Sequence, residues 1–363
     1  MNAGIATFHH GYNYGATLQE YALFTAVEQM GHTAHILDIP LPATRNGQPH
    51  LGDYLCFDLG PYRYARRAFR VTVEFALKPF KQDTFLAFEQ AHLRMGRLPG
   101  ELGAPAYGAL ICGSDQVWNP QITDGDSRFF LRFDSPATKT RIAYAPSFGA
   151  RDEVPESFLP ALREYLQSID ILSCREQEGA ETVEELTQRP CPRIPDPVML
   201  LTPEDWSRLA RPPRKMPAGK YIFCYDMRRG PLIMDAAHAL EAQSGGSLYY
   251  LEGFRGKKGW RSPVGPAEFL WLIQHAETVI TNSFHASVFS VLFQKPLRVV
   301  YPATMITRLK ELLERLHLKH LLVSTVEDAA RPAPWDAAAT VPLIAAERAL
   351  GRNFLQRALE KAR

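Results

Sequence analysis

The sequence predicts an α/β protein built from two Rossmann-like domains that face each other across a cleft. Short apolar runs of strand length alternate with stretches of helical periodicity, and the alternation restarts after the basic, proline-rich stretch 211–217. A chain of 363 residues also has the length of two ordinary domains. We therefore expect an N-terminal domain over 1–210, a C-terminal domain over 218–342, and a helix over 343–363 that crosses back to the first domain.

The N-terminal half alternates predicted strands and helices with one interruption. The predicted strands are 5–8, 35–39, 109–112, 141–145 and 169–174, and the predicted helices are 16–30, 156–167 and 178–187. Apolar runs this short are typical of buried parallel strands, and Gly31 is expected to end the first helix. Aromatic residues and arginines interrupt the alternation at 46–88, which we interpret as a partly helical insertion.

The C-terminal half repeats the pattern. The predicted strands are 221–225, 247–251, 278–281 and 297–301, and the predicted helices are 232–243, 267–276, 283–293, 307–316 and 343–361. Ligands of such sheets bind at the carboxyl ends of the strands. The loops that directly follow predicted strands are therefore the places where we expect functional residues.

Composition excludes several classes of protein. Lysine plus arginine is 41 and aspartate plus glutamate is 39, so the chain lacks the basic excess of a nucleic-acid binder. The five cysteines are scattered without a C-x-x-C pair, which disfavours a zinc site or a disulfide framework. The start has no signal-peptide pattern and no apolar run approaches membrane-spanning length, so we expect a cytoplasmic protein with no metal and no cofactor. The arginine- and aromatic-rich stretch 62–80 is either a helix with its aromatic side chains packed inward or a peripheral contact with an anionic membrane.

A histidine follows one predicted strand of the second half. His285 comes after Asn282, Ser283 and Phe284, and Ser283 is a natural N-cap. The first turn of a helix has free N–H groups that favour an anion, so His285 is a candidate ligand-binding or catalytic residue. The alternative is a histidine that hydrogen-bonds a neighbouring loop.

Two loops of the first half are also candidates. The octet 113–120 follows a predicted buried strand, and Ser114, Asp115 and Asn119 can bind a substrate or stabilise the loop itself. The earlier loop, 11–15, occupies the place of a phosphate-binding loop but matches neither G-x-G-x-x-G nor a Walker A motif. It is better interpreted as a loop whose backbone approaches a ligand.

Cations near the expected cleft could bind phosphate or carboxylate. Arg175 follows a predicted strand and Arg308 begins a predicted helix, and arginine suits bidentate contacts with such anions. A salt bridge with a nearby glutamate is the alternative for each. The loop 255–261 combines four cations with Trp260, and it is either a ligand-binding loop or a solvated surface loop.

Taken together, these motifs resemble the polysaccharide pyruvyl transferase family. The matching blocks run in order from residue 5 to about residue 320. They are 13–16 with Leu18 and Gln19, 113–120, 142–149, 173–176, 196–197, 265–270 and 281–285 with 288–290. This chain has Ala286 where many members have glycine, and Gly108 where many have aspartate.

The resemblance implies an architecture similar to that of B-type glycosyltransferases and an activity on bacterial cell-surface polysaccharides or exopolysaccharides. Better-known members move the enolpyruvyl group of phosphoenolpyruvate onto two sugar hydroxyls, forming a pyruvate ketal. The implied partners are phosphoenolpyruvate and a saccharide or lipid-linked saccharide. A nucleotide-sugar glycosyltransferase and a non-catalytic glycan-binding homologue remain as alternatives.

The resemblance also implies residue roles. His285 would bind the donor phosphate or act as general acid, and Asp115 would orient or deprotonate an acceptor hydroxyl. Arg175, Arg308 and the start of the helix at 283 would hold the donor's phosphate and carboxylate. The other implied substrate-binding residues are Asn13, Tyr14, Gly15, Ser114, Asn119, Ser147, Asn282, Ser283 and Phe284.

Overall fold

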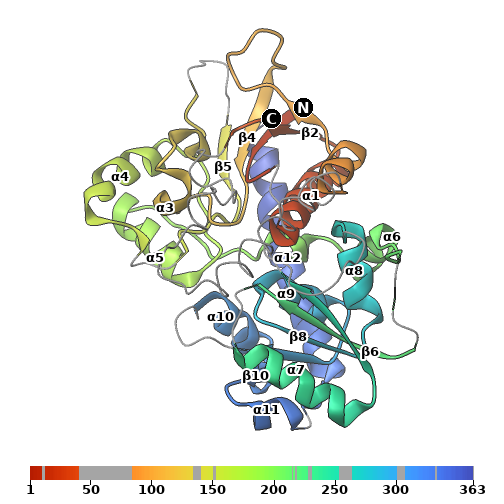
Figure 1. The fold of residues 1–363 in the computed structure, drawn as a ribbon. Coiled ribbons are helices and arrows are strands. Elements are labelled where there is room, and N and C mark those ends of the chain that lie inside the picture. The colour runs from red at the N-terminus through yellow and green to blue at the C-terminus, as the bar shows by residue number, and fades with distance from the viewer. Residues whose placement is uncertain are drawn as a thin grey trace, which may run out of the picture.

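The computed structural model describes residues 1–9, 13–40, 84–133, 140–149, 153–214, 216, 219–227, 231–252, 264–300, 307–331 and 333–362. It shows two domains, each with a parallel sheet covered by helices, which confirms the predicted α/β, two-domain class (Figure 1). Most of the expected insertion at 46–88, the stretch 62–80 and the loop 255–261 lie outside the described residues.

The N-terminal sheet has five parallel strands in the order β3-β2-β1-β4-β5. The strands are β1 (Asn2–Ala6), β2 (Thr33–Leu37), β3 (Met95–Gly96), β4 (Tyr107–Cys112) and β5 (Thr140–Ala143). Side chains alternate across the sheet: Ala3 and Ile5 face α1 (Tyr14–Gln29) and α12 (Ala337–Lys361). The opposite face, which includes Ala6, packs against α4 (Leu159–Gln167) and α5 (Gln177–Thr187).

The C-terminal sheet has five parallel strands in the order β10-β9-β8-β6-β7. The strands are β6 (Tyr221–Asp226), β7 (Ser247–Glu252), β8 (Thr278–Thr281), β9 (Leu297–Val300) and β10 (Leu322–Val323). One face packs against α8 (Pro266–His275), α9 (Phe284–Leu292) and α10 (Thr307–Arg315). The other face packs against α7 (Pro231–Ser244) and α11 (Val326–Ala330).

Short elements join these layers. They are α3 (Pro120–Thr123), α6 (Pro203–Leu209) and the 3-10 turns η2 (Ser127–Phe130), η4 (Glu156–Phe158), η5 (Pro197–Leu200) and η6 (Lys319–Leu321). Residues 84–92 are also helical. The turn η5 is central to the molecule because it contacts α1, α9 and α12.

The last helix, α12, contacts both domains. Ile344 is part of the C-terminal core, whereas Leu355 and Leu359 pack under the N-terminal sheet. The helix begins at Ala337, earlier than the expected 343, because the Asp336 carboxylate accepts a hydrogen bond from the N–H of Ala339 at its start. Pro342 is accommodated inside the helix.

The predicted strand 169–174 is not a strand. The segment is buried but makes only isolated bridges, Ile142 with Ile171 and Cys174 with Arg193. A short apolar run predicts burial equally well whether or not the backbone pairs along its length, so periodicity could not separate the two cases.

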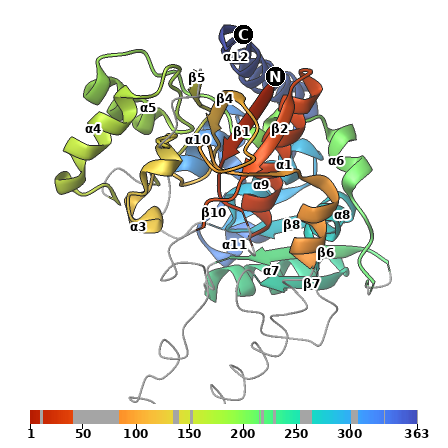
Figure 2. The ribbon, with the colours of Figure 1, turned by 90° about the horizontal axis from the view of Figure 1, so that it is seen from above.

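Each sheet reverses its strand order once. The N-terminal sheet does so between β1 and β4, and the C-terminal sheet between β6 and β8. In doubly wound folds the carboxyl ends of the strands beside such a point form the ligand crevice. Helix α1, which follows β1, and helix α9, which follows β8, contact each other where the domains meet (Figure 2).

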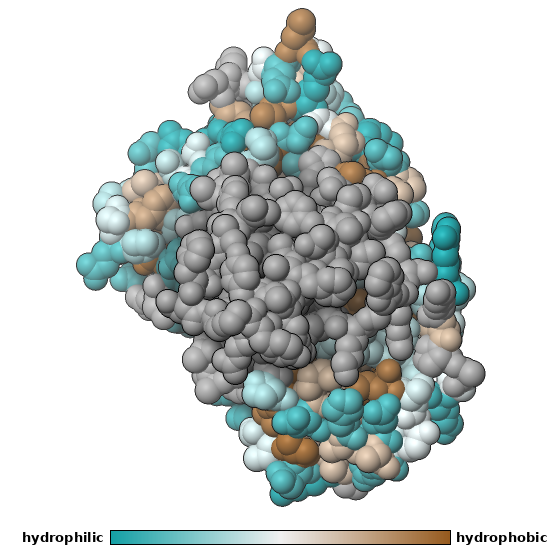
Figure 3. Space-filling model, viewed as in Figure 1, coloured by the Kyte–Doolittle hydropathy of each residue, from teal (hydrophilic) through white to brown (hydrophobic). Residues whose placement is uncertain are grey.

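Few large hydrophobic side chains are exposed among the described residues. The exposed large hydrophobic side chains among these residues are Met95, Leu102, Val341 and Leu350. The coloured atoms of Figure 3 are mainly hydrophilic, with scattered apolar ones. In the described ranges, no helix combines the length and hydrophobicity needed to cross a bilayer.

Candidate functional site

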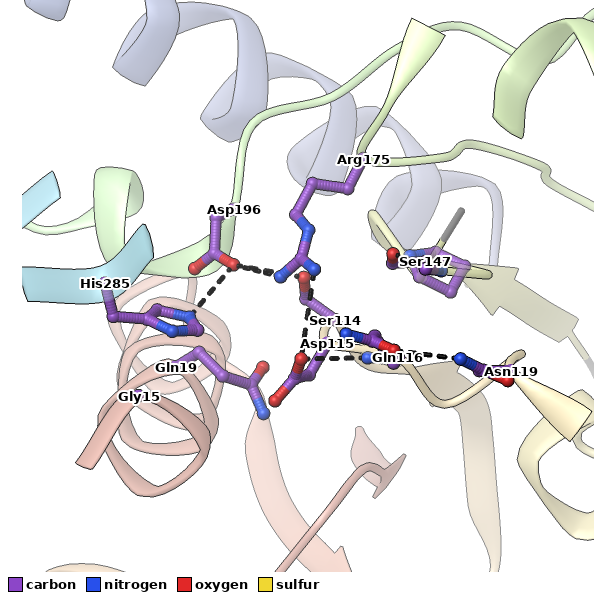
Figure 4. Close-up of polar contacts among 12 residues, drawn as sticks. Gly15, Gln19, Ser114, Asp115, Gln116, Asn119, Ser147, Arg175, Asp196 and His285 are labelled. Carbon is purple, nitrogen blue, oxygen red and sulfur yellow. Dashed lines mark hydrogen bonds and ion pairs between the residues drawn. The ribbon is translucent and has the colours of Figure 1, made fainter. Parts of the chain in front are cut away.

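Three ionisable side chains, those of Arg175, Asp196 and His285, meet where the two domains touch (Figure 4). The Nη1 atom of Arg175 donates to Oδ2 of Asp196 at 2.7 Å. The Nε2 atom of His285 lies 3.4 Å from the same oxygen. Arg175 and Asp196 belong to the N-terminal domain and His285 to the C-terminal domain, so the cluster exists only when the domains are docked.

Asp196 is the centre of this cluster. Its side chain is 1% exposed, and its Oδ1 accepts a hydrogen bond from the N–H of Val198 at the start of η5. Burial by itself would raise the pKa of this carboxyl group. The charge of His285, its side-chain contact, Arg175 and the Val198 N–H outweigh burial and hold the pKa of Asp196 well below its usual range. The carboxylate is therefore ionised at neutral pH.

Sequence reasoning placed Asp196 in the family pattern but assigned it no role. A signal was present, because Asp196 is the only charged residue of the otherwise apolar stretch 194–201. A carboxylate in such a stretch is buried with it and needs partners. Local sequence could not name those partners, because they come from residues 175 and 285.

Arg175 is held by carboxylates. Besides Asp196, it contacts Oε1 of Glu176 through Nε at 2.9 Å, and its Nη2 lies 3.8 Å from Oδ1 of Asp115. Burial would lower the pKa of the guanidinium, but the charges of Glu176, Asp196 and Asp115 raise it above its ordinary value. The group also lies over the ring of Phe284, 5.2 Å from its centroid. The structure therefore shows the salt-bridge alternative for Arg175, with Glu176 and Asp196 as partners. A contact with a substrate anion stays a prediction.

Arg175 still has hydrogen-bonding capacity. Its Nη2 makes no hydrogen bond to any residue that the structure describes, although the side chain is only 4% exposed. A buried N–H group without an acceptor is costly. A ligand oxygen that accepts from Nη2 would remove that cost.

His285 is the second residue of α9. The Oγ of Ser283 accepts from the N–H of Ala286 at 3.4 Å, as the predicted N-cap requires. The imidazole rests against Gly15 at the start of α1, where a Cβ atom would overlap the ring. Glycine at 15 therefore makes room for His285, and Asp196 supplies a negative partner that the helix start alone does not.

The octet brings two of its residues to the cluster. The Oγ of Ser114 donates to Oδ2 of Asp196 at 3.4 Å. Asp115 adopts a left-handed backbone with φ of 69°, a conformation that costs energy for a residue with a Cβ atom. Its Oδ1 accepts from the N–H of Gln116 at 2.9 Å, which holds the carboxylate beside Arg175.

Asn119 and Ser147 stabilise loops. Asn119 caps α3 and donates through Nδ2 to Oε1 of Gln116 and to Oε2 of Glu153. Ser147 accepts through Oγ from the N–H of Gly149 at 3.0 Å, and its own N–H donates to the carbonyl of Asp115. Both side chains are buried, so they support the Asp115 loop from behind.

Asn13 and Tyr14, at the start of α1, make different structural contacts. The side chain of Asn13 caps the helix by accepting from the N–H of Gly15 at 2.9 Å. The ring of Tyr14 stacks on Phe269 of the other domain with centroids 4.3 Å apart, and its hydroxyl donates to the carbonyl of Val264 at 2.7 Å. Tyr14 thus holds the domains together.

Asn282 joins the ends of two strands. Its Nδ2 donates to Oδ1 of Asp226 and its Oδ1 accepts from the N–H of Met227, both at 2.8 Å. Asp226 also accepts from the hydroxyl of Tyr250 at 3.1 Å. The backbone of Arg308 belongs to α10, and its side chain lies outside what the structure describes.

A cavity of about 470 Å³ lies beside the cluster, between α5 and the segment around 148–159. Apolar side chains such as Phe148 and Leu186 form part of its wall, and Glu176 and Glu178 supply carboxylates. Among the described residues that line it there is no lysine or arginine. Its chemistry suits a neutral or cationic polar group better than an anion.

Within the described ranges, no three histidine, cysteine, aspartate or glutamate side chains are arranged to bind a metal ion. The described cysteines, Cys112, Cys174, Cys191 and Cys224, are buried free thiols.

Comparison with known families decides the class of the protein. A sequence profile of the family described as polysaccharide pyruvyl transferase matches residues 13–303. The chain belongs to the polysaccharide pyruvyl transferase family. The matched range of this transferase-family chain includes the whole cluster: Asp115, Arg175, Asp196 and His285. No curated protein matches the chain in a sequence search.

Several solved structures align with nearly the whole of this family member. A UDP-N-acetylglucosamine 2-epimerase aligns with a TM-score of 0.52 at 8% identity, covering 99% of this chain and 94% of that one. The UDP-GlcNAc 2-epimerase of Neisseria meningitidis gives 0.47 at 9% identity, covering 99% and 100%. A spinosyn rhamnosyltransferase gives 0.44 at 13% identity, again covering 99% and 100%. Identity this low bears on the fold alone, and the first of these structures, with a TM-score above 0.5, supports the two-domain α/β architecture.

Proposed function

We propose that this protein transfers the enolpyruvyl group of phosphoenolpyruvate onto two hydroxyls of a saccharide, forming a pyruvate ketal and releasing phosphate. Family membership supports the class of reaction. The observation that carries the proposed site is the contact of His285 and Arg175 with one buried oxygen of Asp196, at 3.4 and 2.7 Å. The acceptor is a saccharide or lipid-linked saccharide in the cytoplasm, on the route to a bacterial cell-surface polysaccharide.

The reaction needs an acid. A proton adds to the methylene carbon of phosphoenolpyruvate, which becomes the methyl group, and the adjacent carbon takes on oxocarbenium character. The first sugar hydroxyl adds to that carbon and loses its proton. Phosphate then leaves, taking up one proton as hydrogen phosphate, and the carbon takes on oxocarbenium character again. The second hydroxyl adds and loses its proton, so the two protons released replace the two that were consumed. In this scheme protonated His285 is the acid, and ionised Asp196 stabilises its charge.

The reaction also needs a base and anion contacts. Asp115, held beside Arg175 by the N–H of Gln116, accepts the proton of an acceptor hydroxyl. The free Nη2 of Arg175 and the N–H groups at the start of α9 bind the donor's acidic groups. Carboxylates outnumber cations among the described groups of the cluster, so we assign the remaining negative charge of the donor to Arg308, the further cation that the sequence analysis predicts for the donor.

The experiment that tests this proposal is a thermal-shift titration with phosphoenolpyruvate and, separately, with a panel of nucleotide sugars. Ligand at 100 times its Kd adds about 2.7 kcal/mol of stability, which a melting curve resolves. We expect stabilisation by phosphoenolpyruvate that is lost in His285→Gln. The control is His238→Gln, because His238 lies on α7 with a 60% exposed side chain.

Other outcomes would assign a different function. Stabilisation by a nucleotide sugar and not by phosphoenolpyruvate would indicate a glycosyltransferase. Binding of saccharides with indifference to both donors would indicate a glycan-binding homologue. A His285→Gln variant that binds phosphoenolpyruvate and transfers at the wild-type rate would remove His285 from the mechanism.

A further inference from the structure

Gln19 is a buried polar residue that faces the proposed active site without a full set of partners. It lies on α1 one turn after Gly15, and its side chain is directed toward Asp115 (Figure 4). The residue is 0% exposed. Its Oε1 accepts no hydrogen bond from any residue that the structure describes.

The orientation of the Gln19 amide follows from its neighbours. Nε2 donates to Oγ1 of Thr7 at 2.8 Å, and the Thr7 hydroxyl donates its own hydrogen to the carbonyl of Ser114 at 3.2 Å. The Thr7 oxygen can therefore only accept from Gln19. A flipped amide would place two acceptors against each other, so Oε1 is the atom left to face the site.

A ligand that enters the site can supply the hydrogen-bond donor that this enclosed acceptor lacks among the described residues. An amide oxygen can only accept, and leaving it unpaired in a buried place costs free energy. Phosphoenolpyruvate presents phosphate and carboxylate oxygens, which are acceptors and cannot supply the hydrogen. A sugar hydroxyl can.

We propose that Gln19 binds one hydroxyl of the acceptor saccharide while Asp115 receives the other, so that the two side chains recognise a diol. This inference rests on the proposed function. A ketal joins two hydroxyls to one carbon, and the site accordingly presents two acceptors, one from α1 and one from the octet loop. The free Nη2 of Arg175, 3.8 Å from Asp115, is then left for an oxygen of the donor.

The test compares acceptor and donor kinetics in Gln19→Leu. The probes are methyl glycosides of galactose, glucose and mannose and their 2-acetamido analogues, with product detected as the methyl signal of the ketal. We expect the KM for the glycoside to rise about tenfold, the loss expected of one buried hydrogen bond. The KM for phosphoenolpyruvate should not change, because Gln19 does not contact the donor.

The matched control is Gln274→Leu. Gln274 on α8 also donates through Nε2 to a hydroxyl, Oγ of Ser207 at 2.7 Å, but it lies away from the cluster. A second pair tests the orientation of the amide: Thr7→Val removes the oxygen that anchors Nε2, and Thr7→Ser keeps it. We expect the glycoside KM to rise in Thr7→Val and to stay near the wild-type value in Thr7→Ser.

Deoxy glycosides identify the hydroxyl. The analogue that lacks the hydroxyl bound by Gln19 should show the same KM in the wild-type protein and in Gln19→Leu. An unchanged glycoside KM in Gln19→Leu, or an equal rise in the KM of both substrates, would overturn this inference and leave the proposed function standing. Absence of turnover by the wild-type protein with every glycoside would count against the proposed function itself.

Discussion

The imidazole of His285 and the carboxylate of Asp196 meet across the domain boundary, with Nε2 3.4 Å from Oδ2. Asp196 directly precedes η5, which packs against α1, α9 and α12, so this carboxylate lies where elements of both domains converge. Arg175 contacts the same oxygen at 2.7 Å. Domain docking and assembly of the proposed catalytic cluster are therefore one structural event.

We expect Asp196→Asn to lower both activity and stability. The substitution keeps an acceptor for the Val198 N–H but leaves Arg175 and His285 without their shared negative partner. Removing one member of a buried ion pair costs about 3–5 kcal/mol, measurable by chemical denaturation. Loss of the acid's partner should lower turnover by about 10²-fold or more.

The stability difference should depend on pH. Because the folded-state pKa of Asp196 is lowered, its contribution is fully present above the unfolded-state pKa of about 3.9 and is lost as pH falls toward the folded-state value. The gap between wild type and Asp196→Asn should shrink as pH falls below about pH 4. Asp336→Asn, which changes a surface N-cap, should show neither the gap nor the loss of activity.

Glu20→Gln should stabilise the protein at neutral pH. Glu20 is 0% exposed, and its two carboxylate oxygens have no hydrogen-bond partner among the described residues. Burial, and then the charge of Glu89, raise its pKa well above the ordinary value. Stability is therefore lost as pH rises above the unfolded-state pKa of about 4.3, and the substitution should recover about 1–3 kcal/mol at pH 7.

A second glutamate of α1, Glu28, provides a control for the Glu20 prediction. The pKa of Glu28 is lowered: burial opposes this, but the Ala34 N–H and Arg94 outweigh it. Glu28→Gln should therefore destabilise at pH 7, the opposite sign to Glu20→Gln. Equal stability of wild type and Glu20→Gln from pH 4 to pH 8 would contradict the prediction.

Gly15→Ala should impair chemistry with little damage to the fold. The added Cβ atom overlaps the imidazole of His285 and forces the ring to move. A displacement of about 1 Å at a catalytic group can cost about 10²-fold in rate. Gly96→Ala is the comparison, since its Cβ would lie 2.6 Å from the Tyr107 hydroxyl, on the edge strand β3 of the N-terminal sheet. That variant should lose stability and keep its affinity for phosphoenolpyruvate. If it instead kept its stability and lost that affinity, the assignment of His285 to the reaction centre would be refuted.

Tyr14→Phe should weaken the domain interface and leave donor binding intact. The lost hydrogen bond to Val264 is worth about 1 kcal/mol. Tyr221→Phe is matched, because its hydroxyl also donates to a backbone carbonyl, that of Leu272 at 2.8 Å, within one domain. Both variants should melt earlier by similar amounts. A loss of phosphoenolpyruvate affinity in Tyr14→Phe alone would return Tyr14 to the substrate-binding residues.

Local patterns predicted most elements because their causes are local. The strand 278–281 coincides with β8, and the helix 16–30 differs from α1 by two residues at its start and one at its end. Gly31 does adopt the left-handed backbone of a helix stop, with φ of 79°. The prediction of a strand over 169–174 was wrong, because a buried segment has the same apolar pattern whether or not it pairs as a strand.

The sequence predicted which residues lie together at the site, but it did not predict several of their contacts. Asp115, Arg175 and His285 do lie together. Asp115 follows β4, His285 follows β8 of the other sheet, and Arg175 follows a segment that is not a strand, so the docking of the two domains brings them together. Nothing in the spacing of the chain indicated that Tyr14 would be buried against the other domain or that the amide of Asn282 would be occupied by Asp226 and Met227.

The sequence by itself determined the fold class, the family and the loops that carry the polar residues, because periodicity, caps and motifs depend on neighbours in the chain. Only the tertiary structure decided that Asp196 joins Arg175 to His285, that Gly15 makes room for the imidazole, and that Gln19 faces the site with a free oxygen. These contacts connect residues far apart in sequence. They depend on how two separately formed sheets dock, and no local pattern encodes that geometry.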